Sequence, residues 1–265
     1  MRKPMPIRRR TLLGAALALS LGPGLALPGR AEAAGTTGAL IGVAASFAAP
    51  ARAIAKAYAA ASGNTIRLAV APTVTLQSRI IKGAPYDAML SDDALTPEEL
   101  ATVGYVVRDS RFTYAVGKLA LWYPRGTKIT DPAALMMDPK IAHVAMADPD
   151  LTPYGAAARE AIDALGLERK LDAKLLKAPD VGGALAMVRT GKASLGFVAY
   201  SALTGPQAPR GGAVWVVPTS DYAPIHQDAA LLKHGRNNAA ARGFLDFLKG
   251  PQARKVMAAY GYGAI

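Results

Sequence analysis

The sequence predicts an α/β protein built on parallel sheets. Short apolar runs typical of buried strands alternate with segments of helical periodicity along most of the chain. Several of these runs end in a hydroxyl, Asp or Gly residue that leads directly into a helix. With 265 residues, of which 51% are hydrophobic, the chain is long enough for one or two such domains with a sizeable core.

The clearest strand–helix unit begins with a predicted strand at 40–44. Phe47, Ile54 and Tyr58 then recur at helical spacing, as expected for a face packed on a sheet. Ser46 stands at the junction between the two elements. Its hydroxyl is expected either to cap the helix or to face an anion beside the free backbone N–H groups of the first turn.

The other elements follow in chain order. Further strands are predicted at 65–70, 88–90, 119–123, 141–147, 195–199, 213–218 and 228–233. Helices are predicted at 76–82, from 97, from 132, at 153–165, from 181 to 190, at 237–250 and at 251–260.

At least four predicted helix N-termini follow strands and carry hydroxyl or small residues. They lie near Ser46, Thr73, Tyr154 and Val181. Each alone is consistent with ordinary capping, but in open α/β sheets ligands bind beyond the carboxyl ends of strands. Two such sites in each half of the chain therefore indicate a cleft that holds an anion. The Asp92–Asp93 pair at a further junction is interpreted as capping, because its charge would repel an anion.

The first 33 residues have the pattern of a cleaved signal peptide. A basic start, MRKPMPIRRR, precedes an apolar stretch and an Ala-x-Ala site at Ala31–Ala33. The pair Arg9-Arg10 resembles a twin-arginine export signal, and the Sec route stays open as an alternative. An uncleaved membrane anchor is disfavoured because Gly and Pro interrupt the apolar stretch.

The charge pattern gives little support for nucleic-acid binding. The formal net charge is +12, and without residues 1–33, which hold six Lys or Arg and one Glu, 25 basic and 18 acidic residues leave +7. The basic residues are scattered and do not alternate with aromatic ones. A mildly positive protein attracts small anions.

The sequence offers no cofactor site and no catalytic constellation. It has no Cys, and its three His, at 143, 226 and 234, lack metal-ligand spacing. His143 is expected to be a core residue of a strand. Nucleophile-elbow, Walker and dinucleotide-binding motifs are absent. We therefore expect no directly bound metal, no cofactor and no enzyme activity.

Six stretches carry a resemblance to a known family. They are AASF at 44–47, TLQSRIIKGAPYDAMLSDD at 75–93, the segment 147–165, APDVGGALAMV at 178–188, GKASLGFV at 191–198 and the closing segment 234–262. In these stretches the sequence resembles the periplasmic molybdate-binding proteins of ABC importers. The resemblance implies a two-lobed periplasmic binding protein (type II) with mixed sheets, helices on both faces and a ligand cleft between the lobes. Lobe 1 is expected at 34–116 plus 227–265, and lobe 2 at 117–226.

The resemblance also implies which residues bind the oxyanion. Ser46 matches a serine that gives its hydroxyl and backbone N–H, Thr73 falls where a second serine is usual, and Tyr154 and Val181 fall where backbone N–H groups bind. The family's binding tyrosine falls on Ala199, so we hypothesise that the phenol of Tyr154 replaces it, with Tyr200 as the competing candidate.

The implied function is capture of molybdate or tungstate in the periplasm and delivery to an inner-membrane ABC permease with its ATPase. The protein is expected to act as a monomer without nucleic acid. Uncharged donors favour a fully deprotonated dianion, whereas a ligand bearing a proton would need an acceptor such as Asp180. Two alternatives stay open: another oxyanion or small organic anion in the same fold, and an exported hydrolase.

Overall fold

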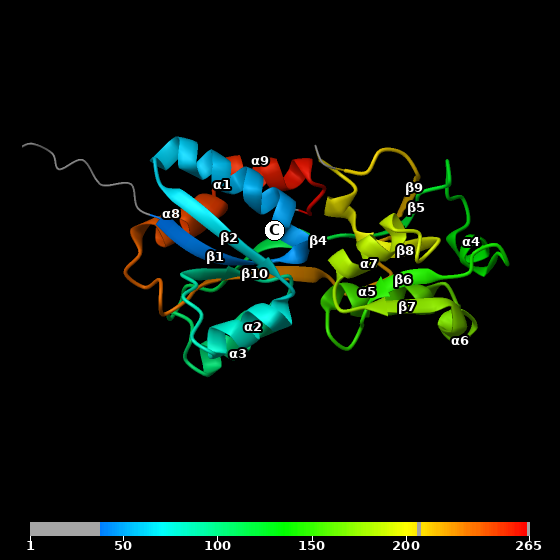
Figure 1. The fold of residues 1–265 in the computed structure, drawn as a ribbon, viewed down its shortest axis with the longest axis horizontal. Helices are drawn as coiled ribbons and strands as arrows, with labels where there is room; N and C mark the ends of the chain where they lie inside the picture. Colours follow the sequence, from blue (N-terminus) through cyan, green and yellow to red (C-terminus); the bar gives the residue numbers. More distant parts are fainter. Residues whose placement is uncertain (1–37, 206–207, 264–265) are drawn as a thin grey trace, which may run out of the picture. The chain divides into compact units, whose positions relative to one another are not determined.

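The computed structural model describes residues 38–205 and 208–263, so the predicted signal peptide at 1–33 lies outside the described residues. Two five-stranded sheets form the fold (Figure 1). Their strand orders are β2-β1-β3-β10-β4 and β7-β6-β8-β5-β9. Within the described residues, no helix is both long and apolar enough to cross a membrane.

The first sheet is mixed. Strands β1 (Gly38–Ala44), β2 (Thr65–Ala71) and β3 (Ala88–Leu90) run parallel, while β10 (Ile225–Leu231) runs antiparallel to both β3 and β4 (Phe112–Gly117). One face is covered by α1 (Ala48–Ser62), α8 (Ala239–Leu248) and α9 (Pro251–Ala259), and the other by α2 (Thr73–Ile81) and α3 (Leu95–Thr102) (Figure 1).

Side-chain alternation along the strands explains these two layers. Ile41 and Val43 of β1 are fully buried on the face that packs against Phe244 of α8. Met89 of β3 points to the opposite face and packs with Leu76 of α2. Successive side chains of a strand point to opposite faces, so a strand buried on both sides is apolar throughout.

The second sheet repeats this arrangement. Its strands are β5 (Leu119–Tyr123), β6 (Val144–Ala147), β7 (Leu175–Ala178), β8 (Leu195–Ala199) and β9 (Ala213–Val216). On one face lie α4 (Pro132–Met137), α5 (Pro153–Ala164) and α6 (Glu168–Leu171), and on the other lies α7 (Val181–Arg189) (Figure 1). Three short 3₁₀ turns complete the description: η1 (Ala45–Phe47), η2 (Asp172–Lys174) and η3 (Tyr200–Ala202).

The chain passes between the sheets at two places. The first is the short link from β4 to β5 at Gly117 and Lys118, and the second is the segment 217–224 between β9 and β10. Gly117 lies against the aromatic ring of Tyr154, because a Cβ at Gly117 would be 3.0 Å from the Cζ of Tyr154. Only glycine therefore leaves room for the Tyr154 phenol beside this link.

Some sequence expectations about elements are wrong. Strands β4 and β7 and helix α6 were not predicted, and β10 begins at Ile225 rather than at residue 228. His143 is exposed and precedes β6, which starts at Val144, so it is not a core residue. The apolar run from Ile141 includes a non-sheet segment that carries the chain up to the strand.

Candidate functional site

Strand register brings three side chains to one edge of the first sheet. Ala44, the last residue of β1, is paired with Ala71, the last residue of β2, and the neighbouring Val43 is paired with Leu90 at the end of β3. Two residues beyond these three strand ends come Ser46, Thr73 and Asp92, respectively. Because the strands are parallel and in register, all three residues lie beyond the same carboxyl edge.

The hydroxyl of Ser46 is buried without a partner. Ser46 is 8% exposed, and its Oγ is enclosed and makes no hydrogen bond. The expectation that Ser46 caps the helix is wrong: Ser46 lies inside η1, which runs directly into α1, and neither N-terminus has a side-chain cap. A buried unpaired hydroxyl costs free energy, so it is a feature that a hydrogen-bonding ligand would stabilise.

The backbone carbonyl of Ser46 accepts hydrogen bonds from two side-chain hydroxyl groups that lie elsewhere in the chain. Its carbonyl oxygen accepts hydrogen bonds from the Oγ of Ser201 at 3.2 Å and from the phenol of Tyr262 at 2.9 Å. Ser201 belongs to η3 after β8 of the second sheet, whereas Tyr262 follows α9. The bond from Ser201 ties η1 to the second sheet, and the bond from Tyr262 ties it to the segment after α9.

Thr73, the first residue of α2, is buried and faces a carboxylate. Its Oγ1 donates to the Oδ1 of Asp92 at 2.5 Å and lies 3.4 Å from the Oγ of Ser91. The Thr73 hydroxyl therefore lies at the expected edge but is already engaged by an acidic group.

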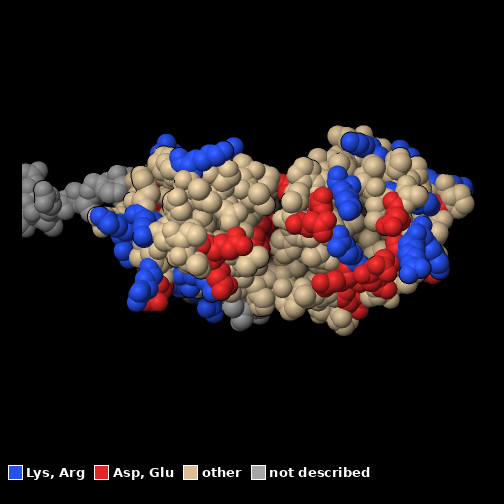
Figure 2. Space-filling view, turned by 90° about the horizontal axis from the view of Figure 1, so that it is seen from below, with Lys and Arg blue, Asp and Glu red and all other residues tan. Residues whose placement is uncertain are grey.

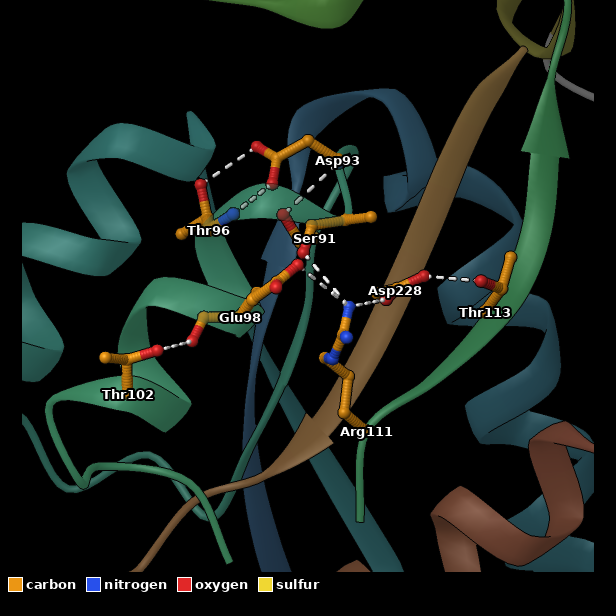
Figure 3. Close-up of polar contacts among 9 residues, drawn as sticks. Ser91, Asp93, Thr96, Glu98, Thr102, Arg111, Thr113 and Asp228 are labelled. Carbon is orange, nitrogen blue, oxygen red and sulfur yellow. Dashed lines mark hydrogen bonds and ion pairs between the residues drawn. The ribbon is translucent and has the colours of Figure 1, made fainter. Parts of the chain in front are cut away.

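The two neighbouring aspartates have different environments. Asp93 accepts from the backbone N–H of Thr96 at 2.6 Å in the first turn of α3, and this part of the capping prediction is confirmed (Figure 3). The Asp92 side chain accepts from the hydroxyl of Thr73 and from no backbone N–H of a helix's first turn in the described residues, so its interpretation as a capping residue is wrong. Asp92 is 4% exposed. Burial raises the pKa of Asp92 from 3.8 to about 6.

The second sheet supplies two helix N-termini. Ala147 of β6 pairs with Ala178 of β7, and α5 and α7 begin beyond these strand ends. Thr152 and Asp180 cap the two helices through their side chains, at 2.9 Å from the N–H of Gly155 and 2.6 Å from that of Gly183. The first-turn N–H groups of such helices are an anion-binding feature.

The side chain of Tyr154 is buried near the link between the sheets. Its phenol oxygen accepts a hydrogen bond from Nε2 of Gln227 at 3.2 Å, and Oε1 of Gln227 accepts one from the phenol of Tyr114 at 3.1 Å. All three residues are buried. Burial raises the pKa of both Tyr114 and Tyr154 well above 10, so both phenols keep their protons.

A cavity of about 250 Å³ lies between the two strand edges. Its lining includes Ser46 of η1, Val181 and Gly182 of α7, Ala199 at the end of β8 and Ser201 of η3. A Cβ on Gly182 would lie 3.5 Å from the Cβ of Ala45, so the N-terminus of α7 directly faces η1. Ser46 and Val181, predicted from opposite halves of the chain, thus line one cavity.

The rings at positions 154 and 200 have different surroundings. Ala199 lines the cavity with its small side chain, but Tyr200 is not among the lining residues and its ring packs where a side chain on Gly261 would lie, 2.6 Å away. Tyr154 and Thr73, the other two predicted donors, do not line this cavity either. Tyr154 interacts electrostatically with Asp92 and Tyr262.

Two arginines that the sequence did not single out also line the cavity. Arg52 comes from α1 and Arg189 from α7, and both are exposed. Their positive charges favour an anion in the cavity. Arg52 could have been recognised only as a polar residue on the outer face of a helix, because its neighbours come from the other half of the chain.

A second charged cluster has a structural role. Arg111 pairs with the buried Asp228 at 3.0 Å and lies 3.7 Å from Glu98, while Thr113 donates to Asp228 at 2.7 Å (Figure 3). Asp228 is thereby satisfied within the first sheet. In the described residues, no group of three or more His, Cys, Asp or Glu is arranged to hold a metal ion.

The paired sheets, with the N-terminus of α7 and η1 facing a cavity between their carboxyl edges, are typical of a protein that binds a small anionic solute. On the face that Figure 2 shows, acidic and basic side chains are interspersed. The family described as bacterial extracellular solute-binding protein matches residues 39–263, and the chain belongs to this family.

Named relatives are similar over nearly the whole chain. Molybdate-binding protein ModA of Rhodobacter capsulatus is 42% identical over 253 residues, covering 96% of this chain and 97% of that protein. ModA of Azotobacter vinelandii is 40% identical and covers 93% and 96%, respectively. The solved structure of the Azotobacter vinelandii periplasmic molybdate-binding protein matches with a TM-score of 0.80 at 31% identity, covering 86% of this chain and 99% of that one. The two-lobed type II fold is thereby confirmed.

Proposed function

We propose that the chain is a periplasmic substrate-binding protein that captures molybdate or tungstate and delivers it to an ABC permease with its ATPase. The observation that carries the proposal is Ser46, whose buried hydroxyl has no hydrogen-bond partner and which lines a cavity opposite the N-terminus of α7. The 42% sequence identity to a protein named for molybdate binding supports the choice of ligand.

We assign one donor role to each predicted residue. Ser46 gives its hydroxyl and backbone N–H, Thr73 its hydroxyl, and Val181 its backbone N–H at the start of α7. Tyr154 gives its backbone N–H and, in place of the tyrosine missing at Ala199, its phenol proton. That proton is free to donate because the oxygen is the acceptor in the bond from Gln227. The packing of Tyr200 against Gly261 makes it the weaker candidate.

The proposal includes how the protein moves and where its lobes divide. Lobe 1 comprises 34–116 and 227–265 and lobe 2 comprises 117–226, so the hinge lies where β4 meets β5 and at residues 226–227 near the start of β10. Solute-binding proteins close on their ligand by rotation about such links. We further propose that the protein acts as a monomer, without a resident cofactor and without catalysis.

Calorimetric titration of the purified protein with molybdate, tungstate, sulfate and phosphate tests the ligand. We expect molybdate and tungstate to bind more tightly than sulfate and phosphate, and Ser46→Ala to weaken both. Tight binding of sulfate or phosphate alone would replace the proposed ligand with another oxyanion. Turnover of generic ester or phosphate substrates would favour the exported hydrolase instead.

Export is tested separately in cells. Replacing Arg9 and Arg10 with Lys should keep the protein in the cytoplasm, because the twin-arginine route requires the Arg pair. A matched variant that replaces Lys3 with Arg alters the same basic region without touching the pair. Normal periplasmic accumulation of the double variant would assign export to Sec.

A further inference from the structure

Asp92 places an acidic group among the residues proposed to bind an anion. It follows β3 by two residues, as Ser46 follows β1 and Thr73 follows β2, so it lies beyond the same carboxyl edge. Its Oδ1 accepts the hydroxyl proton of Thr73 at 2.5 Å. A second hydrogen bond, from the backbone N–H of Asp92 to the Oγ1 of Thr73 at 3.4 Å, also joins the two residues.

The surroundings of Asp92 contain no compensating positive charge. Among the residues that the structure describes, no Lys, Arg or His forms an ion pair with Asp92. Six polar or titratable residues interact with Asp92 electrostatically or by a hydrogen bond. They belong to its own loop, to α2, to the α7 cap, to β4, to α5 and to the C-terminal segment. They are Asp93, Thr73, Asp180, Tyr114, Tyr154 and Tyr262.

Asp92 does not line the cavity, but Asp180, which caps α7 at the cavity, acts on it electrostatically, so an oxyanion held at the N-terminus of α7 would add a further negative charge near Asp92. Two carboxylates, Asp93 and Asp180, already oppose ionisation of Asp92. Asp180 is committed to capping α7, and Asp93 to the first turn of α3. Asp92 caps no helix, and only Thr73 and its own backbone N–H act on its carboxylate as donors, so Asp92 is the carboxylate that a bound dianion would force to accept a proton.

Protonation also changes what Thr73 can do. While Asp92 is ionised it can only accept, so the Thr73 hydroxyl must donate to it and its proton is not available to a ligand. A protonated Asp92 can donate its own O–H to the Oγ1 of Thr73. The Thr73 proton is then free to point at the oxyanion, and the charge repulsion disappears at the same time.

We propose that Asp92 is a specificity-determining residue that couples oxyanion binding to the uptake of one proton from solvent. The proton is held on the Asp92 carboxyl, which donates to Thr73, and Thr73 in turn donates to the oxyanion. The inference rests on the proposed oxyanion site. It implies that the site binds a dianion together with a proton and binds the dianion poorly when Asp92 is ionised.

The expected pH dependence follows from linkage. Because burial raises the pKa of Asp92 to about 6, the carboxyl is largely protonated at pH 5 and largely ionised at pH 8. Proton uptake on binding should therefore rise from near zero at about pH 5 to near one at about pH 8. Over the same interval the association constant should fall by up to about tenfold for each pH unit above the pKa.

The experiment is calorimetric titration with molybdate at pH 5 and pH 8, each in two buffers of different ionisation enthalpy. The difference between the buffers gives the number of protons taken up for each molybdate bound. Asp92→Asn is the test variant, because its amide donates to Thr73 as a protonated carboxyl does but cannot titrate. Asp93→Asn is the matched control, because Asn keeps a capping oxygen for α3 and changes the charge by the same amount.

We expect wild type and Asp93→Asn to take up about one proton at pH 8 and Asp92→Asn to take up none. The affinity of Asp92→Asn for molybdate should be nearly equal at the two pH values. Equal uptake in wild type and Asp92→Asn would overturn the inference while leaving the oxyanion site intact. No binding of molybdate by wild type at either pH would instead reject the proposed function.

Titration with phosphate is the second part of the test. Near neutral pH phosphate carries its own O–H, which can donate a hydrogen bond to an ionised Asp92. If phosphate binds at pH 8 more tightly than molybdate and without proton uptake, Asp92 is an acceptor for a protonated ligand and the proposed coupling is wrong. Weaker binding of phosphate than of molybdate, with proton uptake confined to molybdate, supports it.

Discussion

The phenol oxygen of Tyr154 lies 3.2 Å from Nε2 of Gln227, from which it accepts a hydrogen bond. Gln227 belongs to β10 of the first sheet, whereas Tyr154 is in the first turn of α5 beside the second sheet. The bond therefore joins the two halves of the protein at a fully buried position. It also orients the phenol so that its proton remains available to a third group.

The first prediction concerns Tyr154→Phe, which keeps the ring and removes only the O–H. If the phenol donates to the oxyanion, affinity should fall by about 1.5–3 kcal/mol. Stability should fall as well, by about 1–3 kcal/mol, because the buried amide of Gln227 loses its acceptor. Calorimetric titration and urea unfolding measure the two effects separately.

The control for Tyr154 is Tyr200→Phe, because the Tyr200 ring packs at Gly261 rather than at Gln227. We expect this variant to bind molybdate like wild type. An unchanged affinity in Tyr154→Phe together with a loss in Tyr200→Phe would transfer the donor role to Tyr200.

The second prediction concerns Ser46→Ala. Affinity for the oxyanion should fall by about 1.5–3 kcal/mol, the range for a hydrogen bond to a charged group. Stability should not fall, because the Ser46 Oγ caps no helix and has no partner to lose. Ser201→Ala is the contrasting variant, since it removes a bond to the Ser46 carbonyl. A destabilised Ser46→Ala with unchanged affinity would contradict the assignment.

The positions of Ser46, Thr73 and Val181 could be predicted from the sequence because they depend on a local pattern. Each follows a strand and lies at or just before the start of a helix, and parallel strands bring such junctions to one edge. The local pattern does not predict which residues, distant in sequence, a side chain contacts in the folded protein. The Ser46 hydroxyl was therefore expected to cap a helix that instead continues from a 3₁₀ turn.

For Asp92, too, the sequence predicts the position but not the surroundings of the side chain. By position it belongs with Ser46 and Thr73, but its charge suggested that it should avoid an anion. Burial beside Thr73, which changes that expectation, depends on how α2 packs next to the β3 edge. Gln227 likewise became informative only once Tyr114 and Tyr154, far away in sequence, were seen on either side of it.

The third prediction concerns Gly117→Ala at the link between the sheets. A methyl group at Gly117 would lie 3.0 Å from the Cζ of Tyr154 and 3.2 Å from Nε2 of Gln227, so both side chains must shift. We expect weaker oxyanion binding and a loss of stability of about 1–3 kcal/mol, as for an overpacked core. Gly250→Ala provides a comparison, since its nearest contact, the carbonyl of Phe247, lies 3.1 Å away at the surface end of α8. Molybdate affinity equal to wild type in Gly117→Ala would argue against the phenol as a ligand.

The last prediction concerns the dependence of stability on pH without any ligand. Burial raises the pKa of Asp92 from 3.8 to about 6, so between these values the folded protein holds a proton that the unfolded chain has released. The folded state binds more protons, and stability from this residue is therefore present below about pH 4 and is lost as pH rises through about 6. The shift of roughly two units corresponds to about 3 kcal/mol. Asp92→Asn does not titrate and escapes this loss.

Urea unfolding of wild type and Asp92→Asn at pH 4 and pH 7 measures the effect as a difference of differences. This comparison cancels the other carboxylates, including Asp93, whose pKa is also raised by burial. We expect Asp92→Asn to gain about 3 kcal/mol over wild type between the two pH values. A gap between the two proteins that does not change with pH would mean that Asp92 titrates normally in the folded state. The carboxyl would then be too accessible to water to hold a proton for an incoming oxyanion.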